Sequence, residues 1–199
     1  MQVSASRRIG IVLFPGVEEL DAVGPWEVLA YWTKTFADDG WSVCTLSGDG
    51  AAVTCAKGLV VGTDHSFGDC PPLDVLIHPG GQGTRRVLDD HAHLVWVRFQ
   101  RQQIPLLASV CTGSLVYAAA GLLASRPATK HRASLDRLAE LGPSIEVRPE
   151  DRFVDDGDMV TSAGISAGID MALHLVARLA GGDRARQVCR GIQYDPVAP

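Results

Sequence analysis

The sequence lacks segments that would direct the chain out of the cytoplasm or into a membrane. The first eight residues are polar and lead directly into an apolar run, with no apolar signal core. No apolar stretch among the 199 residues is long enough to span a bilayer. We therefore expect a cytoplasmic protein without a membrane partner.

The chain also lacks a basic region of the kind that binds nucleic acid. It has 18 Lys and Arg against 23 Asp and Glu, so its formal net charge is −5. Its densest positive group, at 184–190, adjoins Asp183 and is typical of a solvated helix face. Nucleic-acid backbones are bound by clustered positive charge, so we expect no nucleic-acid partner.

Cysteine and histidine spacings of a metal or redox site are missing as well. The five cysteines are odd in number and include no C-x-x-C pair. Without a signal peptide, this indicates reduced thiols. The histidines do not have metal-ligand spacing, so we expect neither a metal nor another cofactor.

Short apolar runs alternate with helical stretches, and no repeat or linker divides the chain. Strands are expected at 8–14, 41–46, 73–78 and 104–110, in a hairpin at 53–63, and near 145, 153 and 159–162. Helices are expected at 25–36, 91–103, 113–124, 133–141 and 167–179. This order predicts one α/β domain with a mostly parallel sheet and helices on both faces. Ligands of such sheets bind beyond the carboxyl ends of the strands.

One strand end carries a cysteine. The run at 104–110 meets the next helix at Cys111, which Thr112 and Gly113 follow. A strand-to-helix joint of this kind is a nucleophile elbow, which holds one side chain above the sheet. Free N–H groups of the helix favour a thiolate, so Cys111 is predicted to be the one unusually acidic thiol and a nucleophile. A structural cysteine is the alternative.

The loop after the first strand contains Asp21, which faces the same crevice. A carboxyl group beside a thiolate has a raised pKa and can act as a general acid. Asp21 alone could instead cap the following helix. Its neighbours Glu18 and Glu19 are expected to be solvated.

Three further elements are candidates for substrate or oxyanion binding. Gly80 and Gly81 follow the strand at 73–78, where their N–H groups could face developing negative charge, although a plain glycine turn is the alternative. Gly113 begins the helix after the elbow. His131 could orient or deprotonate Cys111, or it could be a surface or capping histidine.

The segment 164–168 has the G-x-S-x-G spacing of serine hydrolases. A triad would need Asp170 and His174, which are expected on the same helix that Ser166 begins. Neither could fold back onto Ser166. We therefore expect Ser166 to cap that helix.

Together these segments resemble the ThiJ/PfpI superfamily, which has a class I glutamine amidotransferase-like domain, over nearly the whole chain. The landmarks are 16–21, 73–81, the cysteine elbow, 129–131 and 164–170. The resemblance implies a single domain over 1–199, a flavodoxin-like sandwich and a homodimer. It also implies that Cys111 is the nucleophile and Asp21 its acidic partner. The large side chains Trp26, Tyr31 and Trp32 of one helix also suggest a dimer.

The elbow is similar to that of isonitrile (isocyanide) hydratases. Protease-like and deglycase-like members tend to have Cys-His-Gly-Pro or Cys-Ala-Gly-Pro with Glu as the acid, whereas this chain has Cys-Thr-Gly-Ser at 111–114 with Asp21. The similarity adds Thr112 to the site and extends to 191–196. The Thr-Thr-His-Trp of that branch is replaced by Thr-Lys-His-Arg at 129–132.

The resemblance implies a small-molecule substrate, with hydration of an isonitrile to an N-substituted formamide through a thioimidate on Cys111. Glyoxalase-like, deglycase-like and protease-like chemistry are alternatives within the superfamily. A different class is the ligand-sensing domain of AraC-type regulators, which often carry Val-Cys-Thr-Gly too. Because the sequence ends at Pro199, we expect no helix-turn-helix to follow, and having both Asp21 and Cys111 favours an enzyme.

Overall fold

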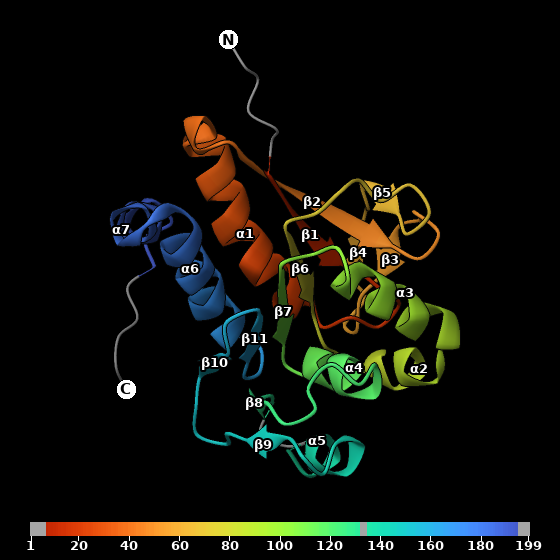
Figure 1. The fold of residues 1–199 in the computed structure, drawn as a ribbon. Coiled ribbons are helices and arrows are strands. Elements are labelled where there is room, and N and C mark those ends of the chain that lie inside the picture. The colour runs from red at the N-terminus through yellow and green to blue at the C-terminus, as the bar shows by residue number, and fades with distance from the viewer. Residues whose placement is uncertain (1–6, 132–134, 195–199) are drawn as a thin grey trace.

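A computed structural model describes residues 7–131 and 135–194 of the chain. A seven-stranded sheet in the order β10-β11-β7-β6-β1-β2-β5 runs through its centre (Figure 1). Its strands are β1 (Arg7–Val12), β2 (Trp41–Ser47), β5 (His65–Ser66), β6 (Val75–His78), β7 (Leu106–Val110), β10 (Phe153–Asp155) and β11 (Met159–Ser162). All neighbours pair in parallel except β10 with β11. The mostly parallel sheet is therefore confirmed.

The central strands are buried on both sides. Every residue of β6, β7 and β11 is buried, which fits their nearly continuous apolar sequences. In the register, Ile77 of β6 lies opposite Ile11 of β1 and Ala108 of β7. The Tyr117 hydroxyl donates a hydrogen bond to the Ala108 carbonyl at 3.0 Å. These strands consequently end at one common edge of the sheet.

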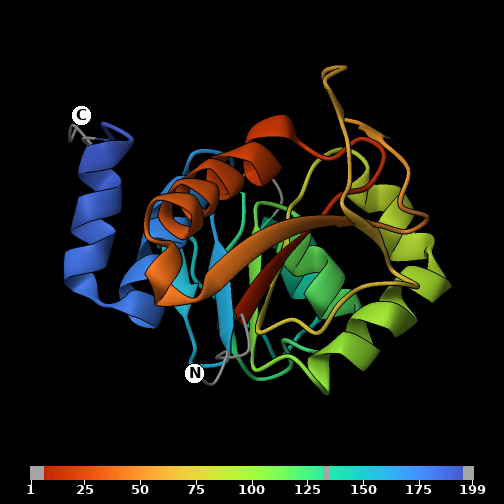
Figure 2. The same cartoon turned by 90° about the horizontal axis from the view of Figure 1, so that it is seen from above.

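Helices cover both faces of the sheet, as predicted for a flavodoxin-like sandwich. On one side lie α1 (Glu19–Thr35), α6 (Ala167–Ala180) and α7 (Gly182–Gly191); on the other lie α2 (Thr84–Asp89), α3 (His91–Arg101) and α4 (Gly113–Ala119) (Figures 1 and 2). Smaller elements surround this core: η1 (Ala37–Asp39), the hairpin β3 (Val53–Thr54) and β4 (Val60–Val61), the pair β8 (Pro127–Ala128) and β9 (Glu146–Val147), and α5 (Leu135–Leu141).

Several boundaries differ from those expected. Helix α1 begins at Glu19, so Pro25 lies inside it rather than in its first turn. Pro25 has no N–H and cannot donate the helical hydrogen bond to the Asp21 carbonyl. Helix α4 ends at Ala119 rather than at 124, because Gly121 is left-handed with φ +78°. Helix α2 was not expected. Residues 133 and 134 of the helix expected at 133–141 lie outside the described residues, as do Arg132 and 195–196.

The large side chains of α1 pack mainly within their own chain. Trp32 is fully buried, and its Nε1 donates to Asp39 Oδ2 at 2.7 Å. Arg184 of α7 pairs with the same carboxylate at 2.7 Å and stacks on Phe36. Tyr31 packs against Gly191. The expectation of a solvated Arg184 is therefore wrong, and Trp32 is engaged within its own chain, because both side chains bind Asp39.

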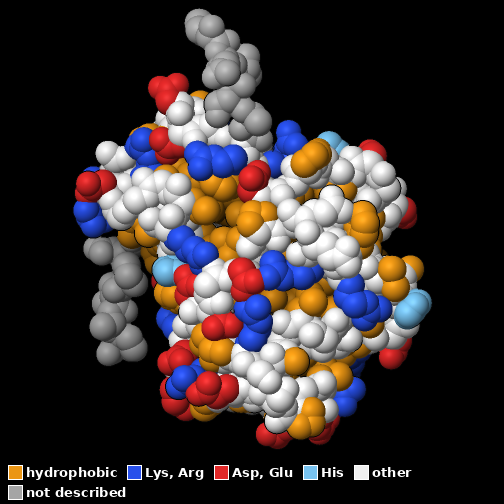
Figure 3. All heavy atoms as spheres, viewed as in Figure 1, with side chains coloured by type: hydrophobic (Ala, Val, Ile, Leu, Met, Phe, Trp, Pro, Cys, Tyr) orange, Lys and Arg blue, Asp and Glu red, His pale blue; other side chains and the backbone are white. Residues whose placement is uncertain are grey.

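The outer surface carries charges of both signs. Positive and negative side chains are interspersed over the face viewed in Figure 3. Within residues 7–131 and 135–194, no helix combines the length and apolar character needed to cross a membrane.

Candidate active site

The carboxyl ends of four adjacent strands converge at one edge of the sheet. They bring Asp21 after β1, Gly80 and Gly81 after β6, Cys111 after β7, and 163–166 after β11. A pocket of about 750 Å³ opens at this edge, with Cys111, Thr112 and His131 in its wall. The crevice expected from the topology is thus present, and Gly81, Cys111, Thr112 and His131 of the predicted residues line it, whereas Asp21, Gly80 and Gly113 lie outside its wall.

Cys111 occupies a strained joint between β7 and α4. Its φ is +56°, a left-handed value that costs a non-glycine residue on the order of 1–3 kcal/mol. Its N–H donates to the carbonyls of Ser162 and Ala163, both at 3.2 Å. A β-carbon on Gly113 would lie 2.0 Å from the His78 carbonyl oxygen, so only glycine fits after Thr112. The surroundings therefore enforce an elbow geometry at Cys111.

Asp21 is hydrogen-bonded to the Cys111 side chain inside the protein. The aspartate is fully buried, and its Oδ2 accepts the Gly80 N–H at 3.2 Å. Its Oδ1 has no hydrogen-bond partner among the described residues. Burial raises the pKa of Asp21 to about 7, although the contacts with Cys111 and Gly80 oppose that rise. The raised pKa agrees with the prediction for a carboxyl group beside this thiol.

The thiol of Cys111 is not unusually acidic. Burial and the negative charge of Asp21 raise its pKa to about 12, and backbone N–H groups of Thr112 and Ile165 offset this only in part. The predicted low pKa is therefore wrong, because α4 is a short helix and a buried carboxylate lies beside the sulfur. Between these two pKa values, the Asp21–Cys111 pair holds one proton, which either the sulfur or the carboxylate can carry.

A second strained joint faces the first. Ile165 follows β11 and also has φ +56°, a rare conformation for a β-branched residue. Its backbone N–H hydrogen-bonds to Asp21 and to Cys111. Ile165 was not predicted, since nothing in an isoleucine side chain signals a left-handed backbone or a useful N–H group.

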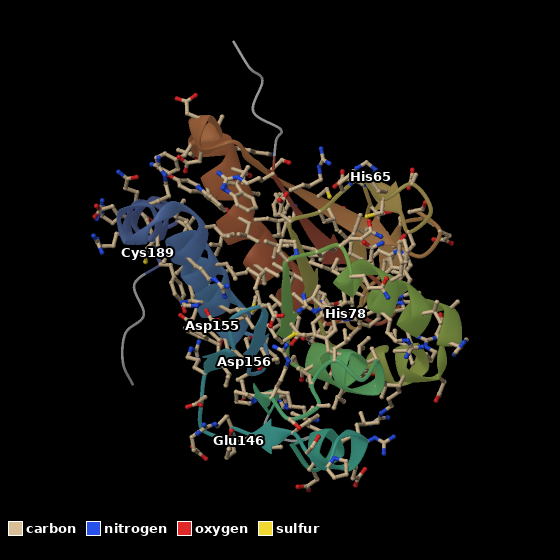
Figure 4. All side chains as sticks on the ribbon, viewed as in Figure 1. His65, His78, Glu146, Asp155, Asp156 and Cys189 are labelled. Atoms are coloured by element: carbon tan, nitrogen blue, oxygen red, sulfur yellow. The ribbon has the colours of Figure 1, made fainter. Side chains whose placement is uncertain are left out.

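Ser166 takes no part in a hydrolase triad. Its Oγ accepts a hydrogen bond from Arg152 at 3.4 Å, and it makes no capping hydrogen bond although it stands at the N-cap of α6. Asp170 pairs with Arg152, and His174 Nε2 lies 2.7 Å from Asp155, which is labelled in Figure 4. The rejection of the triad is therefore confirmed, whereas capping by Ser166 is wrong because its hydroxyl faces Arg152.

The glycine loop after β6 holds the acid and Thr112. Gly80 N–H contacts Asp21, and Gly81 N–H donates to Thr112 Oγ1 at 2.9 Å. The Thr112 hydroxyl also lies 2.9 Å from that of Thr84. A β-carbon on Gly80 would come within 2.4 Å of Thr112 N. Both glycine N–H groups are thus engaged with protein atoms.

A buried histidine pair supports this loop from below and was not predicted. His78, labelled in Figure 4, is fully buried; its Nδ1 lies 2.8 Å from the Pro79 carbonyl and its Nε2 lies 2.9 Å from His93 Nε2. Burial lowers the pKa of His78 to about 3 and that of His93 to about 4. Both rings are neutral at physiological pH, so His78 donates to Pro79 and accepts from His93.

The outer part of the pocket carries charge and includes His131. The ring of His131 lies against the Gly164 backbone and borders the pocket. Glu18 and Glu19 are mostly buried and pair with Lys57, so their expected solvation is wrong. Further charged side chains line the mouth: Arg85, Asp89, Asp136, Arg137 and Glu140. Among the described residues, no group of three or more His, Cys, Asp or Glu could hold a metal ion.

Replacing Asp21 by asparagine should stabilise the fold at alkaline pH. Since the native pKa is about 7 against an ordinary 3.8, the wild type loses stability as pH rises from about 4 to 7, where only the unfolded chain ionises. The difference between these two pKa values corresponds to a loss of at most roughly 4 kcal/mol in the free energy of unfolding. Urea unfolding should show little gain for Asp21→Asn at pH 4 and a gain at pH 8. Exposed Asp38→Asn is the control, and an equal gain at both pH values would contradict this prediction.

Residues 7–178 match the DJ-1/PfpI family. The chain belongs to this family. It is 42% identical over 192 residues to the isonitrile hydratase of Pseudomonas putida, covering 96% of this chain and 80% of that enzyme. It is 34% identical over 195 residues to the HTH-type transcriptional regulator CdhR of Pseudomonas aeruginosa, covering 98% of this chain but only 57% of the regulator.

A solved structure of a ThiJ/PfpI family protein from Pseudomonas syringae has the same fold. It superposes with a TM-score of 0.85 at 32% identity, covering 98% of this chain and 78% of that one. The predicted resemblance to the ThiJ/PfpI superfamily is thus confirmed over nearly the whole chain.

Proposed function

We propose that this DJ-1/PfpI protein hydrates an isonitrile to an N-substituted formamide. The observation that carries the proposal is the pairing of the buried Asp21 with Cys111, whose side chain lines the pocket. The pair places a nucleophile and an acid with a pKa of about 7 in direct contact. The 42% identity to an isonitrile hydratase supports this choice within the family.

The reaction begins when the Cys111 thiolate attacks the terminal isonitrile carbon and its proton resides on Asp21. A new S–C bond forms, the carbon gains negative charge, and Asp21 delivers its proton to that carbon. The product of this step is a thioimidate. Water then adds to the same carbon, with Asp21 taking one of its protons and passing it to the nitrogen. Collapse breaks the S–C bond while the hydroxyl proton passes to Asp21, so the formamide leaves and the thiolate with a protonated Asp21 is restored.

Backbone and hydroxyl groups hold the reacting pair. The N–H groups of Thr112 and Ile165 point at the sulfur and offset part of the charge it carries. Gly80 fixes the Asp21 carboxyl group, and Thr112 fixes the glycine loop. His131 borders the pocket in which the isonitrile side group would lie, whereas Gly113 packs against the His78 carbonyl and not into that pocket. Proton transfers and S–C chemistry account for each step, so we propose a reaction without a cofactor, in the cytoplasm, where the five free thiols stay reduced.

A substrate panel distinguishes this reaction from others in the family. Purified protein is incubated separately with alkyl and aryl isonitriles, methylglyoxal and a peptide amide, with Cys111→Ala as the blank. Formamide production from isonitriles alone supports the proposal. Turnover of methylglyoxal points instead to glyoxalase-like chemistry, and cleavage of the peptide points to protease-like chemistry.

A ligand-sensing role is the second candidate, favoured by the match of 98% of the chain to part of a transcriptional regulator. A sensor would bind a metabolite at the same pocket and return it unchanged. Calorimetric binding of an isonitrile or a formamide by the wild type, without any conversion of the ligand, would favour this role over the enzyme.

We propose that the protein forms a homodimer through α1 and the β3–β4 hairpin. Exposed apolar side chains lie on both elements: Leu20, Val23, Leu59 and Val60. An apolar cavity of about 320 Å³ lies between them, bordered by Val23 and Val61. Sedimentation should give a dimer at micromolar concentration, and Val60→Asp should dissociate it because an unpaired charge would be buried. The control is Val95→Asp on α3. A monomeric wild type would contradict the proposal.

A further inference from the structure

Lys130 carries a buried amine that lacks a partner. Its side chain is 0% exposed, and its Nζ makes no hydrogen bond within residues 7–131 and 135–194. An isolated charge is costly to bury, and burial accordingly lowers the pKa of Lys130 to about 8. A buried, unpaired amine lowers the stability of the fold, and such groups are expected where function requires them.

The backbone fixes Lys130 beside the cysteine elbow. The preceding residue, Thr129, donates its N–H to Thr161 Oγ1 at 2.9 Å and its hydroxyl to the Asp151 carbonyl at 3.2 Å. Thr161 lies on β11, two residues before Ala163, whose carbonyl accepts the Cys111 N–H. Lys130 is therefore anchored to the same strand end that holds Cys111.

Several charged groups act on the Lys130 amine, and Cys111 is one of them. Among these groups, negative charge on Cys111 most favours the ammonium form of Lys130. Asp136 and Glu140 favour that form less, and Arg137 opposes it. The three α5 groups are exposed, so solvent screens them. Cys111 is buried, and its interaction with Lys130 is screened much less.

We propose that Lys130 is a positioning residue that moves the proton of the Asp21–Cys111 pair from the sulfur to the carboxyl group. A cation close to the sulfur stabilises the thiolate with a protonated Asp21 over the thiol with an ionised Asp21. The first of these two states is the one that attacks an electrophile. The role of that thiolate in catalysis rests on the proposed hydratase function, whereas its formation does not.

The test replaces Lys130 and measures thiolate formation without substrate. Lys130→Met keeps an unbranched side chain and removes the charge, and loss of an unpaired buried amine should leave the fold intact. Lys130→Arg keeps the charge. Lys34→Met, in the last turn of α1, removes one positive charge elsewhere. For each protein, the rate of Cys111 alkylation by iodoacetamide is followed from pH 5.5 to 10 with peptide mapping, and thermal unfolding is measured in parallel.

Lys130→Met should alkylate Cys111 about tenfold more slowly at pH 7, with the profile moved to higher pH by about one unit. Lys130→Arg and Lys34→Met should follow the wild type. An unchanged profile in folded Lys130→Met would overturn the proposal, as would equal slowing in Lys130→Arg. If Lys130→Met does not fold, Lys130→Gln is judged by the same criteria. Because alkylation needs no isonitrile, a wild type that fails to hydrate isonitriles refutes the hydratase function and leaves this result standing.

Discussion

Cys111→Ala should reduce formamide production to the uncatalysed rate. The pocket wall contains no other thiol, and Ser166 is engaged with Arg152, so no other nucleophile can replace the sulfur. Initial rates with p-nitrophenyl isocyanide, measured at equal concentrations of wild type and variant, test this expectation. Thermal unfolding should show that the variant remains folded.

Cys44→Ala is the matched control for that loss. Cys44 is also buried, and burial likewise raises its pKa to about 12. It lies on β2 and not at the pocket, so its removal should leave turnover essentially unchanged. Formamide production by Cys111→Ala clearly above the uncatalysed rate would contradict a covalent mechanism at Cys111.

Asp21→Asn should lower kcat/KM by a factor of about 10² to 10⁴, the usual contribution of general acid–base catalysis. An amide accepts the Gly80 N–H but cannot deliver a proton to the isonitrile carbon. In the wild type, kcat/KM should rise with pH through about 7, because below that pH both members of the pair are protonated and no thiolate forms. Asp21→Asn should lack this inflection.

The control for this variant is Asp38→Asn, which removes an exposed carboxyl group in η1, beyond the C-terminal end of α1. It should keep both the rate and the inflection near pH 7. If Asp21→Asn retains wild-type kcat/KM, or keeps the inflection, Asp21 is not the proton donor. Together with its expected stabilisation at alkaline pH, a slow Asp21→Asn protein would show that burying this acid lowers stability and supports catalysis.

The parallel sheet and the place of Cys111 at the end of a strand could be predicted because local sequence determines them. Continuous apolar runs mark buried strands, and the residue after each run lies at the strand end. Tertiary contacts determine the features that were missed. Helix α1, for example, begins six residues before Pro25 and includes Asp21. Proline is usually found in the first turn of a helix, so the sequence predicted a later start.

The electrostatics of the site also depended on long-range contacts. A helix N-terminus predicted an acidic Cys111, but burial beside Asp21 raises its pKa. The left-handed backbone of Ile165 and the His78–His93 contact depend on residues from separate strands and helices. No local sequence pattern predicts either feature. Lys130 is visible in sequence only as a departure from the hydratase pattern, and its burial is evident only in three dimensions.

The most direct test of the central claim is the conversion of cyclohexyl or p-nitrophenyl isocyanide to the corresponding formamide by purified protein. Progress curves are recorded by chromatography for wild type and Cys111→Ala at pH 8, where the Asp21–Cys111 pair has lost its first proton. The predicted result is steady formamide production by the wild type and none above the blank for the variant. A wild type no faster than Cys111→Ala across several isonitriles would contradict the hydratase function.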